Sequence, residues 1–472
     1  MRCFRFSNPL SRRALLQHSA CGFAGLSFSA MAAMAATAGE TSPAQHALPH
    51  LRQRARRVIF LFMWGGPSHV DLFDYKPRLN EFAGKPVTPD AFGGQQPPQG
   101  NILGSPFKFR QHGEGGVWIS ELFPHLAEHA DRLCVIRSMH TEGSAHGEAL
   151  LNLHTGHANL VRPSVGAWVS YGLGTENDNL PAFMTISPPR GHGGVQNYGS
   201  AFLPAMHQGT AIGAAEIPIA KAKIANIGNP TIDRATQREQ LDLIQALNRE
   251  HLERSRADQG IEGLIASYEL AFRMQSAIPQ IMSLSDETKE TLELYGVDSV
   301  GKKPTDNFAR QCLLARKFAE RGVRYIQVST DYTWDHHTKN NEGLVKECAK
   351  VDKPIAGLLT DLARRGLLED TLVVWGAEFG RTPTVENVDG RNHHPAAFTM
   401  WLAGGGVRGG LTYGATDDFG FSPVADPVHM HDFHATLLYA LGLDHKRLTY
   451  RYAGRDFRLT DVFGNVQQRL FM

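Results

Sequence analysis

A set of carboxylate and imidazole side chains follows the apolar runs of this 472-residue sequence, at points where strands are expected to end. Its members are Asp71, His146, Asp335, His336, His337, Glu378, His393, His394, His429, His431 and His434. Mixed carboxylate and imidazole ligands suit Zn²⁺, Mn²⁺ or Fe, whereas oxygen ligands alone suit Ca²⁺ or Mg²⁺. A single histidine on an apolar face is more often a hydrogen-bonded core residue. The occurrence of so many carboxylates and imidazoles at strand ends therefore indicates a divalent metal, with Zn or Mn expected and Ca as an alternative.

Residues 371–383, TLVVWGAEFGRTP, show how a strand would present such a group. Four apolar residues run into Gly376, and Glu378, Gly380 and Arg381 follow. Uninterrupted apolar runs are typical of strands buried on both faces. Since ligands bind at the carboxyl ends of strands in open α/β sheets, Glu378 is expected at a site.

The other elements alternate along the chain. Strands are expected at 57–64, 132–136, 181–186, 323–329 and 397–402, and helices at 120–130, 146–156, 164–172, 306–321, 341–366 and 432–441. Apolar residues at helical spacing predict two or three long helices over 231–296, inserted as a hairpin or cap. Segment 75–116, rich in Pro, Gly and Gln, is expected to be a surface excursion, and 191–209 a loop. The pattern predicts an α/β fold, with a largely parallel central sheet and helices on both faces.

The N-terminus carries a targeting pattern. Arg12 and Arg13 precede a small-residue-rich apolar segment and an A-x-A cleavage site at 36–38. We therefore expect a Tat signal peptide over 1–38, a linker over 39–56 and one domain over 57–466. Export by the Tat machinery would deliver the protein to the periplasm or the medium. The alternative is a membrane anchor, but glycines and serines make the segment weak as a permanent span, so no stable span is expected after cleavage.

Composition excludes other classes. A formal net charge of +1 gives no electrostatic case for nucleic-acid binding. Beyond the expected signal, the cysteines are Cys134, Cys312 and Cys348. Their odd number and wide spacing predict neither a disulfide framework nor a C-x-x-C metal site.

Six blocks of the sequence occur in order in a known family: WGGPSHVDLFDYKP, HTGHANLVRPSVGAWVSYGLG, TWDHHT, GAEFGRTP, GRNHHP and HDFHATLLYALGLDHKRLTYRYAGRDFRLTDVFG. They resemble the secreted bacterial proteins of domain-of-unknown-function family 1501, placed in the alkaline phosphatase and sulfatase superfamily. The resemblance runs from about residue 57 to 466. It implies an alkaline phosphatase/sulfatase-like fold and a small-molecule or glycan ester as substrate, although most of the family has no assigned reaction.

The resemblance also implies ligands. The sulfatase pattern T-L-V-V-F-T-S-D-H-G is similar to TLVVWGAEFG, with Glu378 where a ligand Asp stands and Phe379 where a ligand His or Asn stands. His393 or His394 would then replace the missing ligand. Asp71 resembles the metal Asp after the first strand, but the double Asp of sulfatases is absent.

In two-metal members, an Asp, a nearby His and a late His form the other site. Asp335, His337 and either His429 or His431 match that order, so one or two ions are expected. Two ions would lie roughly 4 Å apart. His434 is expected to support a ligand, and Arg381 either binds an anionic oxygen as a bidentate donor or holds the loop by a salt bridge.

The nucleophile position departs from the superfamily pattern. The sulfatase signature C-x-P-S-R-x-x-L-L-T-G, aligned on Thr155 and Gly156, places His146 where the cysteine stands. A formylglycine cannot form from histidine. Ser144 is the plausible hydroxyl nucleophile, with Ser138 a poorer candidate. Alternatively, His146 is a metal ligand or the nucleophile, or a metal-activated water attacks directly.

Two functions follow from these patterns. The first is an exported, metal-dependent hydrolase of sulfate or phosphate esters. The second is a non-catalytic periplasmic or surface protein that binds glycans or a partner on the same fold. Substitution of the nucleophile favours the second. The many ionisable groups at strand ends favour a bound metal, because like charges repel and buried ones need partners.

Overall fold

A computed structural model describes residues 49–472, except for 87–99, 225–226, 229–230, 255–258 and 299. The expected signal peptide and the first ten residues of the expected linker lie outside this part. Within the described residues, nine strands form the central sheet, in the order β12-β4-β11-β8-β1-β7-β5-β6, with β15 pairing β4. Their bounds are β1 Arg57–Phe62, β4 Leu133–His140, β5 Phe183–Ile186, β6 Thr210–Ile212, β7 Tyr325–Ser329, β8 Thr371–Gly376, β11 Phe398–Ala403, β12 Leu411–Tyr413 and β15 Val428–His429.

The sheet is mostly parallel. β1 pairs in parallel with β7 and with β8, and β5 pairs in parallel with β6 and β7. β11 is the exception, because it runs antiparallel to both β4 and β8. The carboxyl ends of β4, β8, β1 and β7 therefore lie at one edge of the sheet.

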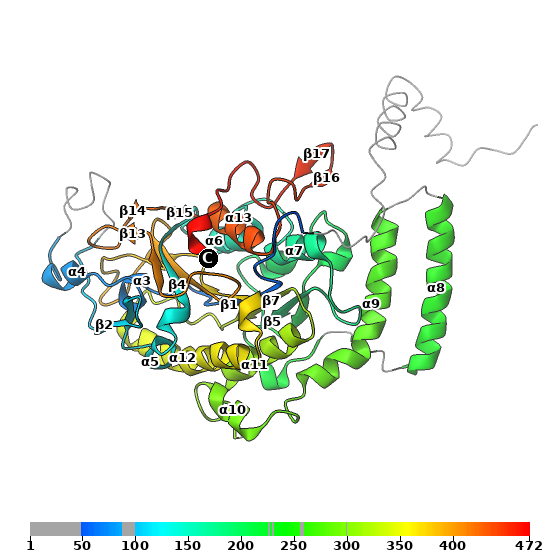
Figure 1. The fold of residues 1–472 in the computed structure, drawn as a ribbon, viewed down its shortest axis with the longest axis horizontal. Helices are drawn as coiled ribbons and strands as arrows, with labels where there is room; N and C mark the ends of the chain where they lie inside the picture. Colours follow the sequence, from blue (N-terminus) through cyan, green and yellow to red (C-terminus); the bar gives the residue numbers. More distant parts are fainter. Residues whose placement is uncertain (1–48, 87–99, 225–226, 229–230, 255–258, 299) are drawn as a thin grey trace, which may run out of the picture. The chain divides into compact units, whose positions relative to one another are not determined.

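Helices cover both faces of the sheet (Figure 1). The longer ones are α6 His146–Thr155, α7 Val165–Leu173, α8 Arg234–Arg254, α9 Gln259–Met282, α10 Lys289–Tyr295, α11 Asp306–Glu320, α12 Asn340–Arg364 and α13 Met430–Ala440. Short helices are α3 His69–Leu72, α4 Pro77–Glu81 and α5 Pro124–Ala127. Two-stranded pairs are formed by β2 Phe109–His112 with β3 Val117–Ser120, β9 Gly380–Arg381 with β10 His393–His394, β13 Ala415–Thr416 with β14 Pro423–Ala425, and β16 Tyr450–Tyr452 with β17 Arg455–Phe457.

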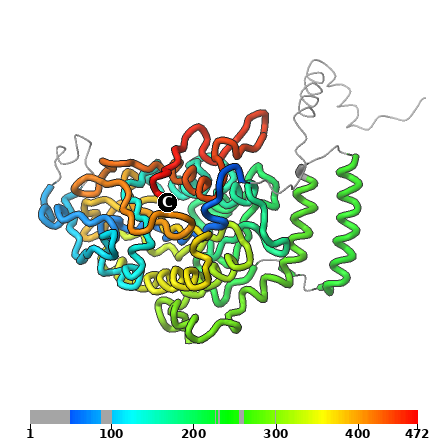
Figure 2. Tube along the Cα trace, viewed as in Figure 1, coloured from blue at the N-terminus to red at the C-terminus, as the bar shows by residue number. Residues whose placement is uncertain are grey.

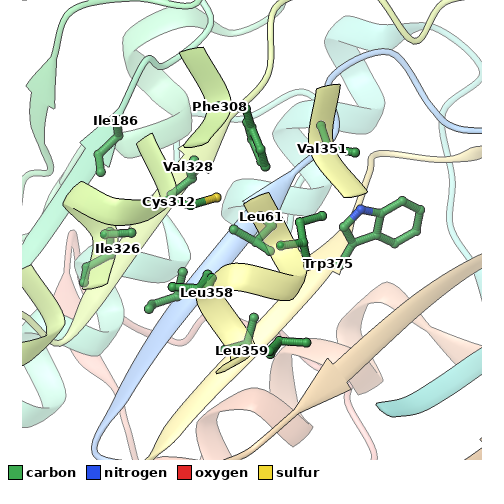
Figure 3. Close-up of a cluster of buried hydrophobic side chains, with 14 of the residues drawn as sticks. Leu61, Ile186, Phe308, Cys312, Ile326, Val328, Val351, Leu358, Leu359 and Trp375 are labelled. Carbon is green, nitrogen blue, oxygen red and sulfur yellow. The ribbon is translucent and has the colours of Figure 1, made fainter. Parts of the chain in front are cut away.

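The central strand explains why its sequence has no polar break. Successive side chains of a strand point to opposite faces. Ile59 and Leu61 accordingly belong to the core under α11 and α12, shown in Figure 3, whereas Phe60 and Phe62 belong to the core under α6, α7 and α13. Both cores need apolar partners from β1, so every residue of the strand is buried.

Most expected elements form close to their expected bounds, but some segments differ. Residues 120–130 were expected to be one helix, but Ser120 ends β3 and Pro124 starts the short helix α5. Thr210–Ile212 adds β6 at the sheet edge, where the sequence predicts only loop nearby. Residues 231–296 hold the two long helices α8 and α9 and the shorter α10, in line with the two or three helices expected there.

The described end of the expected linker, residues 49–56, is docked on the domain. Backbone amides of Leu51 and Ala55 donate to Gly442 and Ala440, and Ala55 is buried. Figure 2 shows this blue segment beside the red C-terminal part of the chain. No helix in the described ranges is both long and apolar enough to cross a bilayer.

Two buried histidines make the fold sensitive to acid. His154 of α6 and His434 of α13 are almost fully buried, and each bonds a backbone carbonyl. Burial lowers the pKa of His154 to about 4 and that of His434 to about 3. In the unfolded chain both imidazoles take up a proton near pH 6.5. Their contribution to folding stability is therefore fully present above pH 6.5 and is lost as the pH falls toward 4.

We therefore expect the free energy of unfolding to drop steeply between pH 6.5 and 4. His154→Gln should remove roughly 3 kcal/mol of that pH dependence. Urea unfolding at pH 7 and at pH 4.5 measures it, with His251→Gln on exposed α8 as the matched control. An equal pH dependence in both variants would contradict the assignment.

Candidate metal centre

Four segments bring polar side chains to the carboxyl edge of the sheet. The loop after β7 carries Asp335 and His337, and α6 begins at His146 after the loop that follows β4. The β8 strand leads to Glu378 and then to β9 and β10, which pair so that His393 faces Arg381. The site thus combines residues nearly 250 positions apart, such as Ser144 and His393, which lie 249 positions apart.

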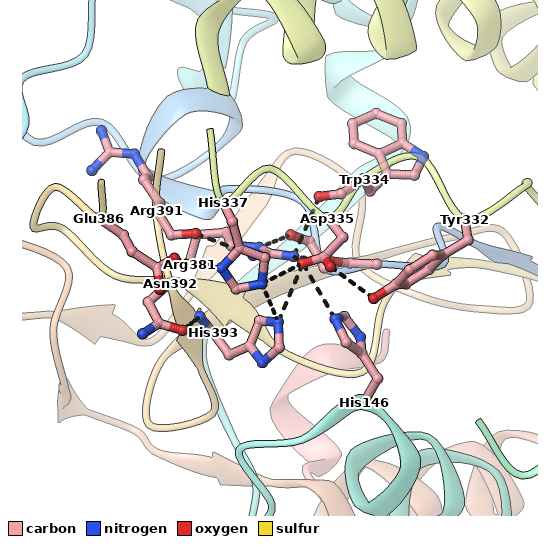
Figure 4. Close-up of polar contacts among 12 residues, drawn as sticks. His146, Tyr332, Trp334, Asp335, His337, Arg381, Glu386, Arg391, Asn392 and His393 are labelled. Atoms are coloured by element: carbon pink, nitrogen blue, oxygen red, sulfur yellow. Dashed lines mark hydrogen bonds and ion pairs between the residues drawn. The ribbon is translucent and has the colours of Figure 1, made fainter. Parts of the chain in front are cut away.

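Three imidazoles converge on one carboxylate oxygen. The Asp335 Oδ1 atom lies 3.3 Å from His146 Nε2, 3.0 Å from His337 Nε2 and 3.2 Å from His393 Nε2. The Nε2 atoms of His337 and His393 are 2.9 Å apart. Figure 4 shows the three rings pointing toward Asp335. Within the described residues, His146, Asp335 and His393 form the group whose ligand atoms all lie within 4.8 Å of one another.

The Nδ1 atom of each imidazole faces a hydrogen-bond acceptor. His146 Nδ1 donates to Glu378 Oε1 at 2.7 Å, and His393 Nδ1 donates to the Ser144 carbonyl at 2.7 Å. His337 Nδ1 donates to Glu386. These partners hold a proton on Nδ1, so the three Nε2 atoms are left to face Asp335 Oδ1, as hydrogen-bond donors while protonated and as ligands when a metal displaces the proton.

This donor set fits a divalent transition metal. Histidine nitrogens and one carboxylate oxygen are ligands for Zn²⁺, and tetrahedral Zn²⁺ with bonds near 2.1 Å keeps its ligands roughly 3.4 Å apart. The separations between the Asp335 oxygen and the three nitrogens are 3.0–3.3 Å. A cation bound there would displace the protons on Nε2. His146, His393 and Asp335, whose ligand atoms all lie within 4.8 Å of one another, would hold it, with His337 Nε2 at 3.0 Å from Asp335 Oδ1 as a further donor.

The charges of the group are strongly coupled. Burial alone would raise the pKa of Asp335, but hydrogen bonds from His146 and His393 and the charge of Arg381 hold it far below its usual range. Burial alone would lower the pKa of His146, but Asp335 and Glu378 raise it. The Asp335 carboxylate is therefore ionised at neutral pH, as a metal ligand must be.

Glu378 is fully buried and supports His146. Its Oε1 atom accepts from His146 Nδ1 and, at 3.0 Å, from the Gly65 amide. Gly65 has φ 121° and approaches the backbone of Asp335 so closely that a Cβ would lie 2.8 Å from its nitrogen. Only glycine allows this approach, which brings the turn after β1 against the Asp335 loop.

Arg381 holds the loops together. Its buried guanidinium donates to the carbonyls of Gly65, Gly66 and Arg391 and to the Asp335 carboxylate. Of the two roles that the sequence left open, this geometry matches the salt bridge. None of these donors points to a free anion site.

Asp71 and His394 lie in other contacts. Asp71 is fully buried and makes a bidentate ion pair with Arg391, with Nε–Oδ2 and Nη2–Oδ1 distances of 2.8 and 3.2 Å. His394 donates through Nε2 to the Phe421 carbonyl and stacks on the Phe421 ring. The structure therefore brings neither of these expected ligands into the histidine group.

The late histidines form a separate cluster. His429 accepts from the His431 amide to cap α13, and its Nε2 atom lies 2.9 Å from Glu142. The rings of His431 and His429 lie 5.0 Å apart, and His434 bonds the Leu153 carbonyl. Among the described residues, none of these three pairs with Asp335. His336, whose ring packs against Gly343, also lies outside the group.

Four contributors were not recognised in the sequence. Glu386 orients His337, the Ser144 carbonyl orients His393, and Tyr332 donates to Asp335 Oδ2 at 2.7 Å. His192 stacks on His146, with ring centroids 5.2 Å apart, and has a φ of 48°. This positive φ is a strained backbone conformation that is visible only in the structure.

The helical insertion does not border this group. A cavity of about 560 Å³ lies along α8 and α9, and no residue of the histidine group lines it. Its lining is apolar with several glutamines, among them Gln208, Gln237 and Gln240. The insertion therefore shapes a surface apart from the histidine group.

The fold and site define an α/β protein with a mostly parallel sheet and a histidine–carboxylate group at the carboxyl ends of its strands. The chain belongs to the family described as a protein of unknown function, DUF1501, whose model matches residues 55–471. No curated protein is similar to it in sequence.

Solved structures similar to the chain include a member of the alkaline phosphatase superfamily and two hydrolases. A protein in the alkaline phosphatase superfamily from Vibrio parahaemolyticus is 11% identical with a TM-score of 0.38, covering 88% of this chain and 74% of that one. The phosphonate monoester hydrolase SpPMH from Silicibacter pomeroyi is 10% identical with a TM-score of 0.37, covering 82% and 73%. The PsFucS1 sulfatase from Pseudoalteromonas sp. is 12% identical with a TM-score of 0.32, covering 83% and 68%.

Proposed function

We propose that this protein is an exported, metal-dependent hydrolase of sulfate or phosphate esters. The observation that carries the proposal is the convergence of three Nε2 atoms on Asp335 Oδ1, each imidazole held by an acceptor on Nδ1. Such a donor set binds Zn²⁺ or Mn²⁺. The twin-arginine pattern supports export of the protein to the periplasm or the medium.

The cation would act as a Lewis acid that polarises an oxygen of the ester. The chain's own residues prepare the site. Glu378, Glu386 and the Ser144 carbonyl keep the protons on Nδ1, and Arg381 fixes Asp335. Burial and the bond to Asp335 raise the pKa of Tyr332, so its phenol stays a proton donor at the edge of the group.

The contacts of His146, Ser144 and Ser138 distinguish these three candidate nucleophiles. Both nitrogens of His146 face carboxylates, Glu378 on one side and Asp335 on the other, so the ring is committed to the group. Ser144 is exposed and its carbonyl bonds His393, so its hydroxyl is the candidate nucleophile of this loop. Ser138 instead donates to the Asp426 carbonyl at 2.6 Å and is buried.

The test is metal content together with ester hydrolysis. The protein purified after Tat export should contain about one equivalent of Zn or Mn per chain by elemental analysis, and His393→Ala should lose it. The metal-containing protein should hydrolyse 4-nitrophenyl sulfate or phosphate esters, and chelation should abolish the activity. Metal without any hydrolysis would instead leave a metal-containing binding protein.

A paired substitution tests the nucleophile. Ser144→Ala should abolish hydrolysis while leaving the metal in place, because the backbone carbonyl that bonds His393 is retained. His146→Ala should lose both metal and hydrolysis. Full activity in Ser144→Ala would remove the hydroxyl from the mechanism and leave attack by water.

A further inference from the structure

The charge balance of the histidine group limits what it can bind. Three carboxylates support it: Asp335, Glu378 and Glu386. Within the described chain, the ion pairs of these three go to His146, His337, His393 and a single guanidinium, that of Arg381. The imidazoles are neutral when their Nε2 atoms are ligands, so Arg381 is the fixed positive charge of the group.

Arg381 cannot turn toward a substrate. It is fully buried, and its donors bond four backbone carbonyls and Asp335. Turning it would leave a buried carboxylate and several carbonyls without partners, each at a cost of roughly 1–3 kcal/mol. Arg190, two positions before His192, is exposed and faces Glu216 at 3.8 Å, so its charge is screened by water and an acid.

One divalent cation makes the group neutral. The three carboxylates supply three negative charges, and Arg381 with the cation supplies three positive ones. A bound dianion would then leave two uncompensated negative charges in a partly buried site, whereas a monoanion would leave one. Unpaired charge in such surroundings is costly, and the cost grows with the excess.

We infer that the substrate is a monoanionic oxyanion ester: a phosphodiester, a phosphonate monoester or a sulfate monoester, in preference to a dianionic phosphate monoester. This inference rests on the hydrolase function proposed above. In the reaction, Ser144 Oγ bonds to sulfur or phosphorus as the bond to the ester oxygen breaks, and the released alcohol takes the hydroxyl proton. The oxygen of water then bonds to sulfur or phosphorus as the bond to Ser144 breaks, one proton of the water returns to Ser144, and the other stays with the oxyanion product.

Hydrolysis tests the inference directly. At pH 8, the metal-loaded protein should cleave bis(4-nitrophenyl) phosphate or 4-nitrophenyl sulfate with a kcat/KM at least about tenfold above that for dianionic 4-nitrophenyl phosphate. Preference for 4-nitrophenyl phosphate would overturn the inference and leave the hydrolase function standing. No cleavage of any of the three would instead remove the hydrolase function on which the inference rests.

Binding gives a readout that needs no turnover. Methanesulfonate and sulfate have similar shapes but carry one and two negative charges. By calorimetry, the metal-loaded protein should bind methanesulfonate more tightly than sulfate. Glu386→Gln keeps the acceptor for His337 Nδ1 but removes one negative charge, so it should shift the ratio toward sulfate by roughly tenfold.

The matched control is Glu342→Gln, which removes an exposed carboxylate on α12. It should leave the methanesulfonate-to-sulfate ratio of the parent. Tighter sulfate binding by the parent, or an equal shift in the Glu386 and Glu342 variants, would overturn the inference.

Discussion

Asp335→Asn should lose the bound metal, with an affinity at least about a hundredfold lower than that of the parent, and hydrolysis should fall with it. Changes to residues that only support metal ligands already cost roughly 10–100-fold. Asp335 does more, because its Oδ1 atom is the point on which His146, His337 and His393 converge. Asparagine keeps the size of the side chain and an acceptor for Tyr332, but it removes the charge. Metal titration with a competing chelator measures the affinity.

The matched control is His429→Asn, which removes an imidazole of the separate cluster and keeps an N-cap for α13. Its metal affinity should equal that of the parent. Loss of one of two metal equivalents in this variant would show that the late histidine binds a second ion, as in two-metal relatives. Retention of metal by Asp335→Asn would contradict the proposed centre. Circular dichroism confirms that each variant is folded.

Asp71→Ala should destabilise the fold by about 3–5 kcal/mol, because it leaves the Arg391 guanidinium charged, buried and unpaired. Both partners are fully buried, and the carboxylate also accepts from Ser68 at 2.6 Å and from Asn340 at 3.1 Å. The pair thus ties α3 after β1 to the start of α12 and to the loop between β9 and β10. Denaturant unfolding measures the loss.

The same contact has a pH signature. Burial alone would raise the pKa of Asp71, but the charge and hydrogen bonds of Arg391 hold it below the ordinary value of 3.8. A carboxylate whose pKa is lowered by folding stabilises the fold at pH values above its pKa in the unfolded chain. That stabilisation is lost as the pH falls through its pKa in the folded protein. Asp71→Ala should therefore also flatten the stability curve below pH 4.

Two controls separate this role from metal binding. Asp418→Asn removes an exposed ion pair with Arg78 and should cost about 1 kcal/mol or less. Asp71→Ala, once folded, should keep its metal. Loss of metal without loss of stability would instead make Asp71 a ligand, as the resemblance to sulfatases implied.

Much of the fold follows from local patterns in the sequence. Uninterrupted apolar runs such as residues 57–62 and 371–376 predict buried strands, because each strand must supply apolar side chains to two cores. Gly156, with φ 70°, ends α6 where the sequence predicts a helix end. These elements depend on neighbours within a few residues, so the sequence reveals them.

Elements set by distant partners were not predicted. The reversal of β11 and the added edge strand β6 depend on which strands pair, not on their own residues. The helix expected over 120–130 is reduced to α5, Pro124–Ala127, and its first residue, Ser120, pairs with Phe109 of β2 instead. Strand pairing over long sequence separations overrides local helix preference.

The site, like the fold, has features that the sequence predicts and features that depend on distant contacts. The sequence by itself determined that His146, Asp335, His337, Glu378 and His393 follow strands, and parallel strands must bring such residues to one edge. The sequence could not distinguish the residues that would bind the metal from those that hold the metal-binding side chains in place. Only the tertiary structure decided that Asp335 receives three imidazoles while Glu378 and Glu386 hold two of those rings. The reason is physical: a strand's end is set by local burial, but a side chain's partner is set by loops that meet across hundreds of residues.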